Sequence, residues 1–148
     1  MIIRDARPDE FGEIYHLCKE LAEYEKLSHE MTATLADYQA LFGGKNPRAF
    51  ALVAEVDGNI VGCAVWHYNV STFLGKLGIY LEDLYVQPEV RGHGIGKAFF
   101  DALKEKARQE GLGRITWQVL DWNEPSIKFY ESLGATCRDG WLTYLIEV

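Results

Sequence analysis

The sequence has little that could crosslink the chain or bind a metal ion. It contains 3 cysteines in 148 residues, widely spaced, with no CxxC pair and no cysteine–histidine spacing that suggests a zinc site. This pattern excludes a disulfide-rich scaffold and gives no sign of a zinc site, so we expect no bound metal. Cys18, Cys63 and Cys137 are instead predicted to be buried thiols.

Long apolar runs and an excess of basic residues are also missing. No apolar run approaches the roughly 18 residues of a membrane span, and residues 1–5 do not resemble a signal peptide. We therefore expect a cytoplasmic protein with no membrane partner. Acidic residues outnumber basic ones by 22 to 15, giving a net charge of −7. A nucleic-acid partner would favour a basic surface, so none is expected, whereas a cationic substrate is compatible with this charge.

Repeats, low-complexity tracts and linkers are absent as well. Hydrophobic residues make up 48% of the chain and charged residues 25%, as in ordinary soluble globular proteins. A chain of 148 residues can bury one sizeable core but is short for two ordinary domains. We expect a single domain over residues 1–148.

The spacing of apolar residues predicts a mixed α/β fold. Helical spacing predicts helices over about residues 8–24, 35–42, 95–110 and 125–133, with Thr34 and Asn123 as N-caps. Alternation predicts strands over residues 49–56, 60–69, 79–86 and 115–120, and closing strands through Trp141, Tyr144 and Ile146. Asp57 and Gly58 form a hairpin turn signal between the first two strands.

A glycine-rich loop lies between a predicted strand and the long predicted helix. Residues 90–97 read Val-Arg-Gly-His-Gly-Ile-Gly-Lys, with Gly92, Gly94 and Gly96 at alternate positions. Glycines allow backbone N–H groups to approach a ligand, and a helix N-terminus favours an anion. The pattern predicts a cradle for a phosphate-bearing cofactor, although glycine clusters of this kind also form simple tight turns.

Two familiar nucleotide-binding motifs fit this loop poorly. A Walker loop requires Ser or Thr after Gly-Lys, whereas Lys97 is followed by Ala98. A dinucleotide fingerprint requires its third glycine further along than Gly96, and it normally opens the first strand–helix unit of a domain.

The run from Arg91 to Gly96 resembles the signature of the GNAT superfamily of N-acetyltransferases, which is Gln or Arg, two residues, Gly, one residue, then Gly or Ala. The resemblance implies a mostly antiparallel twisted sheet flanked by helices, with the loop after the third or fourth strand. It also implies that the loop amides bind the pyrophosphate of acetyl-coenzyme A. The cofactor contacts it implies are Leu84, Tyr85, Val86, Arg91, Gly92, His93, Gly94, Ile95, Gly96, Lys97, Asn123, Pro125, Ser126 and Tyr130.

Further stretches resemble one subfamily, the diamine acetyltransferases, which includes the spermidine/spermine and thialysine enzymes. They are residues 21–25, 80–86 and 122–130, in the same order along the chain. The resemblance implies acetyl transfer from acetyl-coenzyme A to a primary amine of a small cationic substrate, and a homodimer.

The subfamily also implies two proton-handling residues. An alkylamine resembling lysine has a pKa of about 10.4, so a base must remove a proton before it can attack. The resemblance assigns this role to Glu82, acting through a water, and assigns protonation of the leaving thiolate to Tyr130. The plainer interpretations are a solvent-facing strand carboxylate and a packed tyrosine. Cys63 or Cys137 as an acyl-accepting nucleophile is less favoured because neither has an adjacent base signature, so direct attack in a ternary complex is expected.

Substrate choice rests on few residues. Tyr24, Glu25 and Glu82 match residues that line the amine pocket of the subfamily, and a carboxylate would attract a second positive charge. Thr72 stands where spermidine-type enzymes tend to have an acidic residue. This departure favours a smaller amine, such as thialysine, a lysine analogue or a short diamine.

Two other functions remain open at this stage. One is a non-catalytic acetyl-coenzyme A sensor or interaction module, and the other is acetylation of a protein N-terminus or lysine. Of the histidines, His93 is expected to be an exposed loop residue beside phosphates and His67 a packed strand residue.

Overall fold

The computed structural model describes residues 1–148 and divides them into two compact units, Met1–Gln118 and Val119–Val148. The first unit contains a five-stranded sheet and most of the helices, and the second contains one short helix followed by a C-terminal segment. None of the helices has the length and apolar character needed to cross a membrane.

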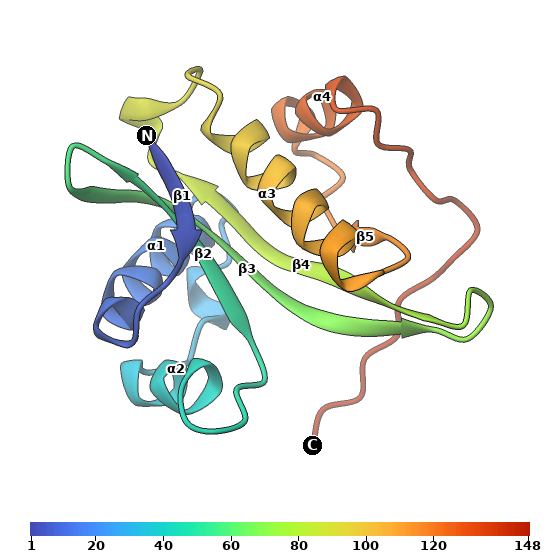
Figure 1. The fold of residues 1–148 in the computed structure, drawn as a ribbon, viewed down its shortest axis with the longest axis horizontal. Coiled ribbons are helices and arrows are strands. Elements are labelled where there is room, and N and C mark those ends of the chain that lie inside the picture. Colours follow the sequence, from blue (N-terminus) through green and yellow to red (C-terminus); the bar gives the residue numbers. More distant parts are fainter. The chain divides into compact units, whose positions relative to one another are not determined.

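The sheet follows the order of the sequence, β1-β2-β3-β4-β5 (Figure 1). Its strands are β1 (Ile2–Asp5), β2 (Phe50–Val56), β3 (Asn59–Ser71), β4 (Lys76–Val86) and β5 (Ile115–Trp117). The first three pairings are antiparallel, and only β4 and β5 run parallel. The predicted mixed, mostly antiparallel sheet is therefore confirmed, and the glycine-rich loop follows its fourth strand.

The predicted strand boundaries need one addition and several shifts. The short strand β1 was not predicted, because two isoleucines in four residues show no readable alternation. β5 is only three residues long, about half of the predicted length. The turn between β2 and β3 is confirmed, with Asp57 and Gly58 at φ 50° and 79° as a tight two-residue hairpin turn requires.

The helices of the first unit begin and end close to the predicted positions. They are α1 (Phe11–Tyr24), α2 (Leu35–Phe42) and α3 (Ile95–Glu110), with short 3-10 turns at Pro8–Glu10, Ser28–Glu30 and Pro88–Val90. Thr34 caps α2 as predicted, since its hydroxyl accepts from the amide of Asp37 at 3.2 Å and its own amide donates to the Asp37 carboxylate at 2.8 Å. Gly111 ends α3 in the left-handed conformation.

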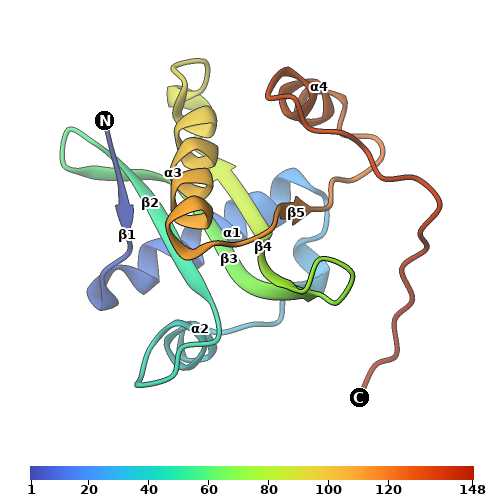
Figure 2. The same cartoon turned by 45° about the vertical axis from the view of Figure 1, so that its right-hand side comes forward.

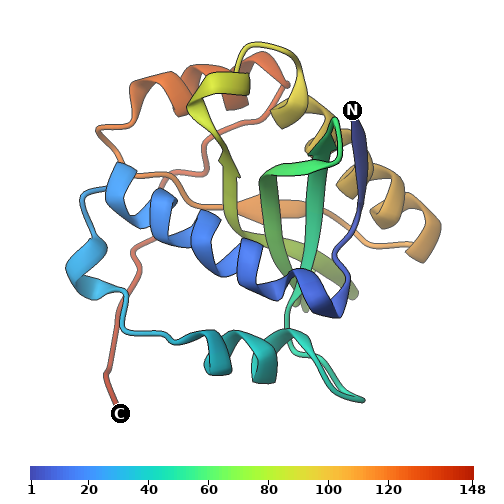
Figure 3. The same cartoon turned by 90° about the vertical axis from the view of Figure 1, so that its left-hand side faces the viewer.

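Helices cover both faces of the sheet in this unit (Figures 2 and 3). Alternate residues of β2 and β3 point to opposite faces, as the pleat of a strand requires. On one face α1 and α2 pack against Ala51, Val53, Cys63, Val65 and Tyr85. The other face carries α3, whose buried residues include Phe99 and Leu103, both 0% exposed. β4 is thus held firmly between two apolar layers up to the loop that follows it.

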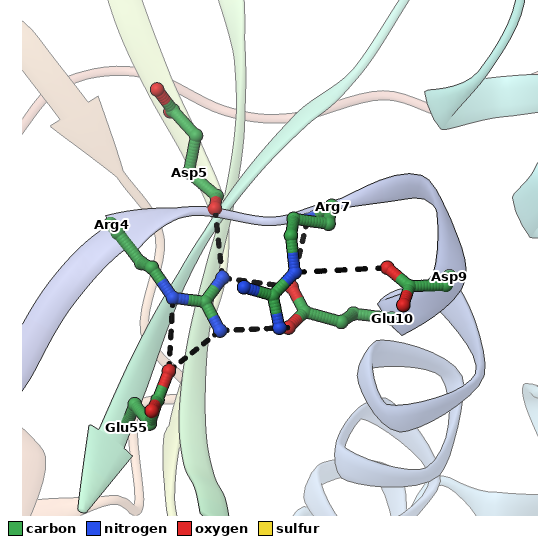
Figure 4. Close-up of polar contacts among 6 residues, drawn as sticks. All are labelled: Arg4, Asp5, Arg7, Asp9, Glu10 and Glu55. Carbon is green, nitrogen blue, oxygen red and sulfur yellow. Dashed lines mark hydrogen bonds and ion pairs between the residues drawn. The ribbon is translucent and has the colours of Figure 1, made fainter. Parts of the chain in front are cut away.

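An ion-pair network joins β1, β2 and the start of α1 (Figure 4). The Arg4 guanidinium donates to both carboxylate oxygens of Glu10, at 2.7 and 2.9 Å, and to Glu55 Oε2 at 2.7 Å. The side chain of Glu10 is only 7% exposed and also accepts from the Arg7 amide at 2.8 Å. Arg4 in particular lowers the pKa of Glu10 to about 2.

The second unit contains α4 (Glu124–Ser132), capped by Asn123 as predicted. The predicted closing strands through Trp141, Tyr144 and Ile146 are wrong: the segment after α4 forms no strand, and these three side chains are 75%, 87% and 87% exposed. Alternation alone does not make a strand, because a strand also needs a hydrogen-bonding neighbour. Cys137 lies in this segment and is exposed, so its predicted burial is wrong as well, whereas Cys18 and Cys63 are buried.

Candidate functional site

A β-bulge positions Glu82. Val65 on β3 pairs with Asp83 on β4, and the next residue, Trp66, pairs with Leu81, so Glu82 is an extra residue without a partner across the ladder. A bulge of this kind changes the direction of side chains and is frequent beside active sites. As a result, the adjacent residues Glu82 and Asp83 both line one cavity instead of facing opposite sides of the sheet.

This cavity has a volume of about 420 Å³ and lies between β4, the end of α1 and the segment that leads to α2. Its volume is in the range of small-molecule sites. Carboxylates dominate its polar lining, because Glu25, Glu30, Glu82 and Asp83 all border it. The remaining lining residues are Cys18, Leu21, Ala22, Leu27, Met31, Thr32, Ala33 and Tyr38. Such a cavity favours a cation with an apolar stem.

Asp83 is the most perturbed carboxyl group of the cavity. Burial, followed by the nearby charges of Glu82 and Glu25, raises the pKa of Asp83 to about 7. The Cys18 thiol donates to Asp83 Oδ2 over 3.9 Å. Burial also raises the pKa of Glu25. Asp83 was not among the predicted site residues, although an aspartate next to Glu82 in a largely apolar strand is a signal that could have identified it.

Glu82 itself is exposed, and a histidine lies beside it. The Glu82 Oε2 atom is 4.0 Å from His67 Nε2, and the two side chains are 57% and 41% exposed. The His67 ring stacks on Tyr80 with centroids 5.1 Å apart. His67 is thus packed against Tyr80, as expected, but part of its side chain is open to solvent.

The buried thiols do not form a nucleophilic site. A hydrogen bond involving Cys18, together with complete burial, raises the pKa of Cys63 well above its ordinary value. A thiol acts as a nucleophile in its thiolate form. Cys63 is therefore a protonated core residue at neutral pH, which removes one of the two thiol alternatives to direct transfer.

The glycine-rich loop has the backbone of an anion cradle. Gly92 and Gly94 have φ values of 81° and 82°, in the left-handed region that glycine adopts without strain. Gly94 is the N-cap of α3, so the loop leads directly into the first turn of a 16-residue helix. The amides of such a first turn have no acceptor within the helix and favour an anion. Lys97 forms an ion pair with Asp101 at 2.6 Å on the exposed face of α3.

Arg91 fixes the start of this loop. Its Nε donates to the carbonyl oxygen of Val86 at 2.6 Å, and its Cζ lies 5.3 Å from the ring centroid of Tyr85 and 5.5 Å from that of Tyr24. The His93 Nδ1 lies 3.2 Å from the Val90 carbonyl oxygen, which closes the turn before Gly94. The loop is thereby joined to the end of β4 and to the last turn of α1.

One edge of β4 is open next to the cavity. β5 pairs with β4 only from Ile79 to Leu81, and β5 ends at Trp117. From Asp83 to Val86, β4 is paired on its β3 side alone. This stretch includes Leu84 and Tyr85, and its open edge can accept an extended ligand by adding backbone hydrogen bonds.

The other predicted site residues are distributed between the two units. Thr72 lies in the turn after β3 and does not line the cavity, and Tyr24 contacts Arg91 instead of the cavity. In the second unit Asn123, Pro125 and Ser126 form the N-terminal turn of α4, and the Asn123 side chain accepts from the Ser126 amide at 3.4 Å. Tyr130 lies near the other end of that helix, beside Phe129 with ring centroids 5.5 Å apart. The functional roles of these residues stay predictions.

The structure contains no group of three or more histidine, cysteine, aspartate or glutamate side chains that could hold a metal ion.

Comparison with known proteins adds an independent line of evidence. The model of the acetyltransferase (GNAT) family matches residues 9–135, a span that crosses both units. The chain is 37% identical over 156 residues to thialysine N-epsilon-acetyltransferase from Mus musculus, covering 98% of this chain and 91% of that protein. It is 34% identical over 149 residues to spermidine/spermine N(1)-acetyltransferase-like protein 1 from Homo sapiens, covering 94% of this chain and 21% of that protein. Among solved structures, a ribosomal-protein-alanine N-acetyltransferase from Brucella melitensis biovar Abortus 2308 matches with a TM-score of 0.77 and 26% identity over 100% of both chains.

Proposed function

Because the chain belongs to the GNAT family of acetyltransferases, we propose that it moves an acetyl group from acetyl-coenzyme A to a primary amine of a small cationic substrate. The observation that carries the proposal is the cavity in which Glu25, Glu82 and Asp83 meet beside the open edge of β4. The names of the relatives, which refer to thialysine and to spermidine or spermine, support an amine of this class.

The residues of the first unit fit acetyl-coenzyme A. This cosubstrate supplies the acetyl group as a thioester. The amides of residues 92–97 hold its pyrophosphate at the N-terminus of α3, where glycines with positive φ keep the approach open. The backbone of Leu84, Tyr85 and Val86 pairs with its extended pantetheine arm along the open edge of β4. In the second unit, Asn123, Pro125 and Ser126 contribute further contacts.

The acceptor amine lies in the acidic cavity. Glu25 and Asp83 attract its positive charges, and Glu82 accepts a proton through a water so that the nitrogen lone pair becomes free to attack. Attack is direct, within a ternary complex: burial keeps the Cys63 thiol protonated, and Cys137 has no adjacent base signature. The Tyr130 hydroxyl protonates the departing thiolate.

The lining of the cavity supports a short acceptor. Its lining combines carboxylates with short apolar stretches, which suits one alkylammonium chain such as thialysine, a lysine analogue or a short diamine. Thr72 supplies no carboxylate for a further amine of a long polyamine. The family model spans residues 9–135, so we assign both units to one acetyltransferase domain over residues 1–148.

We also propose that the protein acts as a homodimer. The tip of the β3–β4 hairpin exposes apolar side chains that a second copy would cover, since patches of this kind often mark protein interfaces. Val70, Phe73, Leu74 and Leu77 are 68%, 97%, 50% and 48% exposed.

One alternative acceptor has a specific observation in its favour. The solved structure from Brucella melitensis is of an enzyme whose name specifies a protein alanine as its acceptor. A protein N-terminus offers one amine, whereas the cavity in this chain gathers several carboxylates and suits a more highly charged small molecule. A sensor without catalysis is a second alternative, which binding of acetyl-coenzyme A without any turnover would support.

A substrate panel tests the proposal. The purified protein is incubated with acetyl-coenzyme A and one of thialysine, lysine derivatives, short diamines, spermidine or an alanine-terminated peptide, and free thiol and acetylated product are both measured. We expect turnover to be fastest with thialysine or a short diamine. Turnover of the peptide alone would favour the protein acceptor, and turnover of none would contradict the proposal.

A further inference from the structure

His67 lies beside Glu82, which borders the proposed acceptor site. It lies on β3 directly opposite Tyr80 of β4, and the two rings stack at an angle of 29° with centroids 5.1 Å apart. Glu82 comes two residues after Tyr80 on β4, and its Oε2 is 4.0 Å from His67 Nε2. Glu82 borders the cavity, and the His67 side chain is 41% exposed.

The hydrogen-bond partner of His67 Nδ1 determines the tautomer of the ring. Nδ1 lies 3.0 Å from the carbonyl oxygen of Tyr68, and a carbonyl oxygen can only accept a hydrogen bond. The hydrogen of the neutral ring is therefore on Nδ1, which leaves a lone pair on Nε2, the nitrogen nearest Glu82. A separation of 4.0 Å is too long for a direct hydrogen bond but can be bridged by one water that bonds to both groups.

We propose that His67 relays the proton that Glu82 removes from the acceptor amine, an inference that rests on the function proposed above. The water between the amine and Glu82 takes one proton from the ammonium nitrogen as it gives one of its own to the Glu82 carboxylate, and the Glu82 carboxyl then passes that proton through the bridging water to His67 Nε2. The imidazolium then releases the Nε2 proton to solvent, while Nδ1–H stays bonded to the Tyr68 carbonyl. Each turnover thus returns Glu82 and His67 to their starting states, and no other reactant is needed.

The charged and titratable groups around His67 are few. β4 contributes Tyr80, Glu82 and Asp83, and the end of α1 contributes Glu25 to the same cavity. β2 contributes no charged or titratable group, because its pairing with β3 ends at Phe50 opposite Trp66, one residue before His67. Replacing another histidine, such as His16 on the exposed face of α1, should therefore leave the relay unchanged.

Chemical rescue tests the relay with the full-length protein. We expect His67→Ala to lower kcat for the best amine by about tenfold or more while its KM changes little, because only proton transfer is affected. Added imidazole should restore kcat with saturation, since it can stack on Tyr80 in the space left by the ring. The matched control is His16→Ala, which should keep wild-type kcat and show no response to imidazole. The double variant His67→Ala/Glu82→Gln should be no slower than Glu82→Gln alone.

Two outcomes would overturn the relay while leaving the acetyltransferase function intact. The first is a wild-type enzyme that acetylates amines and a His67→Ala variant with the same kcat or with no response to imidazole. The second needs no turnover: long-range proton–nitrogen NMR spectra of the neutral protein that place the His67 proton on Nε2. A wild-type protein that acetylates no amine would instead contradict the proposed function itself.

Discussion

The guanidinium of Arg91 lies against the ring of Tyr24, with Cζ 5.5 Å from the ring centroid. Tyr85 flanks the same guanidinium at 5.3 Å, and Val86 accepts its Nε hydrogen at 2.6 Å. Arg91 of the glycine-rich loop is therefore attached to Tyr24 in the last turn of α1, one residue before Glu25 of the acidic cavity. The Arg91–Tyr24 contact thus joins the proposed cofactor loop to the helix end that borders the proposed amine site.

Replacing Arg91 by lysine should weaken cofactor binding. The variant keeps the charge but loses the planar stacking and the Nε hydrogen bond. Together these contributions are worth on the order of 1–2 kcal/mol, so we expect the Kd for acetyl-coenzyme A to rise by about tenfold. Isothermal titration calorimetry measures it. Arg108→Lys, at the exposed end of α3, is the matched control and should bind as the wild type does. An unchanged Kd for Arg91→Lys would show that the loop does not depend on this contact.

The ion-pair network at the start of α1 should stabilise the fold in a pH-dependent way. The pKa of Glu10 is lowered to about 2, so its contribution is fully present above its ordinary pKa of 4.5 and is lost as the pH falls from there toward 2. At pH 7 we expect Glu10→Gln to reduce the free energy of unfolding by about 1–3 kcal/mol, measured by urea denaturation.

Asp9→Asn is the control for Glu10→Gln. Asp9 is 80% exposed and 3.8 Å from Arg7, so its removal should change the free energy of unfolding by less than about 0.5 kcal/mol. If Glu10→Gln is as mild as this control, the network of Figure 4 is not a stabilising feature.

Asp83 should destabilise the fold at high pH. Its pKa is raised to about 7 from 3.8, so the folded state holds the proton more tightly than the unfolded state. Stability should therefore fall as the pH rises from about 4 to about 7, and Asp83→Asn should be more stable than the wild type at pH 8 but not at pH 3.5. Denaturation at both pH values measures the difference.

Asp101→Asn should behave in the opposite way to Asp83→Asn. The Lys97 ammonium lowers the pKa of Asp101, so removing this carboxylate should reduce stability at pH 8. If Asp83→Asn is no more stable than the wild type at pH 8, then burial of the charged Asp83 carboxylate does not destabilise the fold. The same Asp83→Asn variant should raise the KM for the amine if the cavity is the acceptor site.

Tyr130→Phe tests the acid assigned by sequence resemblance. It removes one hydroxyl and keeps the ring beside Phe129. We expect kcat to fall by about 100-fold, with the Kd for acetyl-coenzyme A within about twofold of the wild type, because general acid catalysis typically contributes this much. Phe129→Tyr on the same helix controls for disturbance of α4. Full activity of Tyr130→Phe would show that another group acts as the acid.

The fold was largely predictable because its signals are local. Helical spacing, the Thr34 and Asn123 caps and the Asp57-Gly58 turn each depend on neighbours within a few residues, and each is confirmed. β1 and the C-terminal segment depend on distant pairing partners. A four-residue strand next to β2 leaves no pattern of its own, and an alternating segment such as 141–146 reads as a strand whether or not a partner exists.

The candidate site was predictable only where it is a linear motif. The glycine-rich loop and Glu82 were identified in the sequence, and the structure places them at the two ends of the open stretch of β4. Asp83 was missed for a geometric reason. Alternation predicts that Glu82 and Asp83 face opposite sides, and only the bulge that pairs Val65 with Asp83 and Trp66 with Leu81 puts both beside the cavity.

The most direct test of the account is the kcat/KM for the best amine of the panel, measured for the wild type and for Glu82→Gln at saturating acetyl-coenzyme A. Glu82→Gln keeps the shape of the side chain and removes its ability to accept a proton. We predict that the wild type acetylates a small diamine or thialysine and that kcat/KM for Glu82→Gln is lower by about 100-fold, with the Kd for acetyl-coenzyme A unchanged. A Glu82→Gln variant as active as the wild type would contradict the assignment of this acidic cavity as the acceptor site.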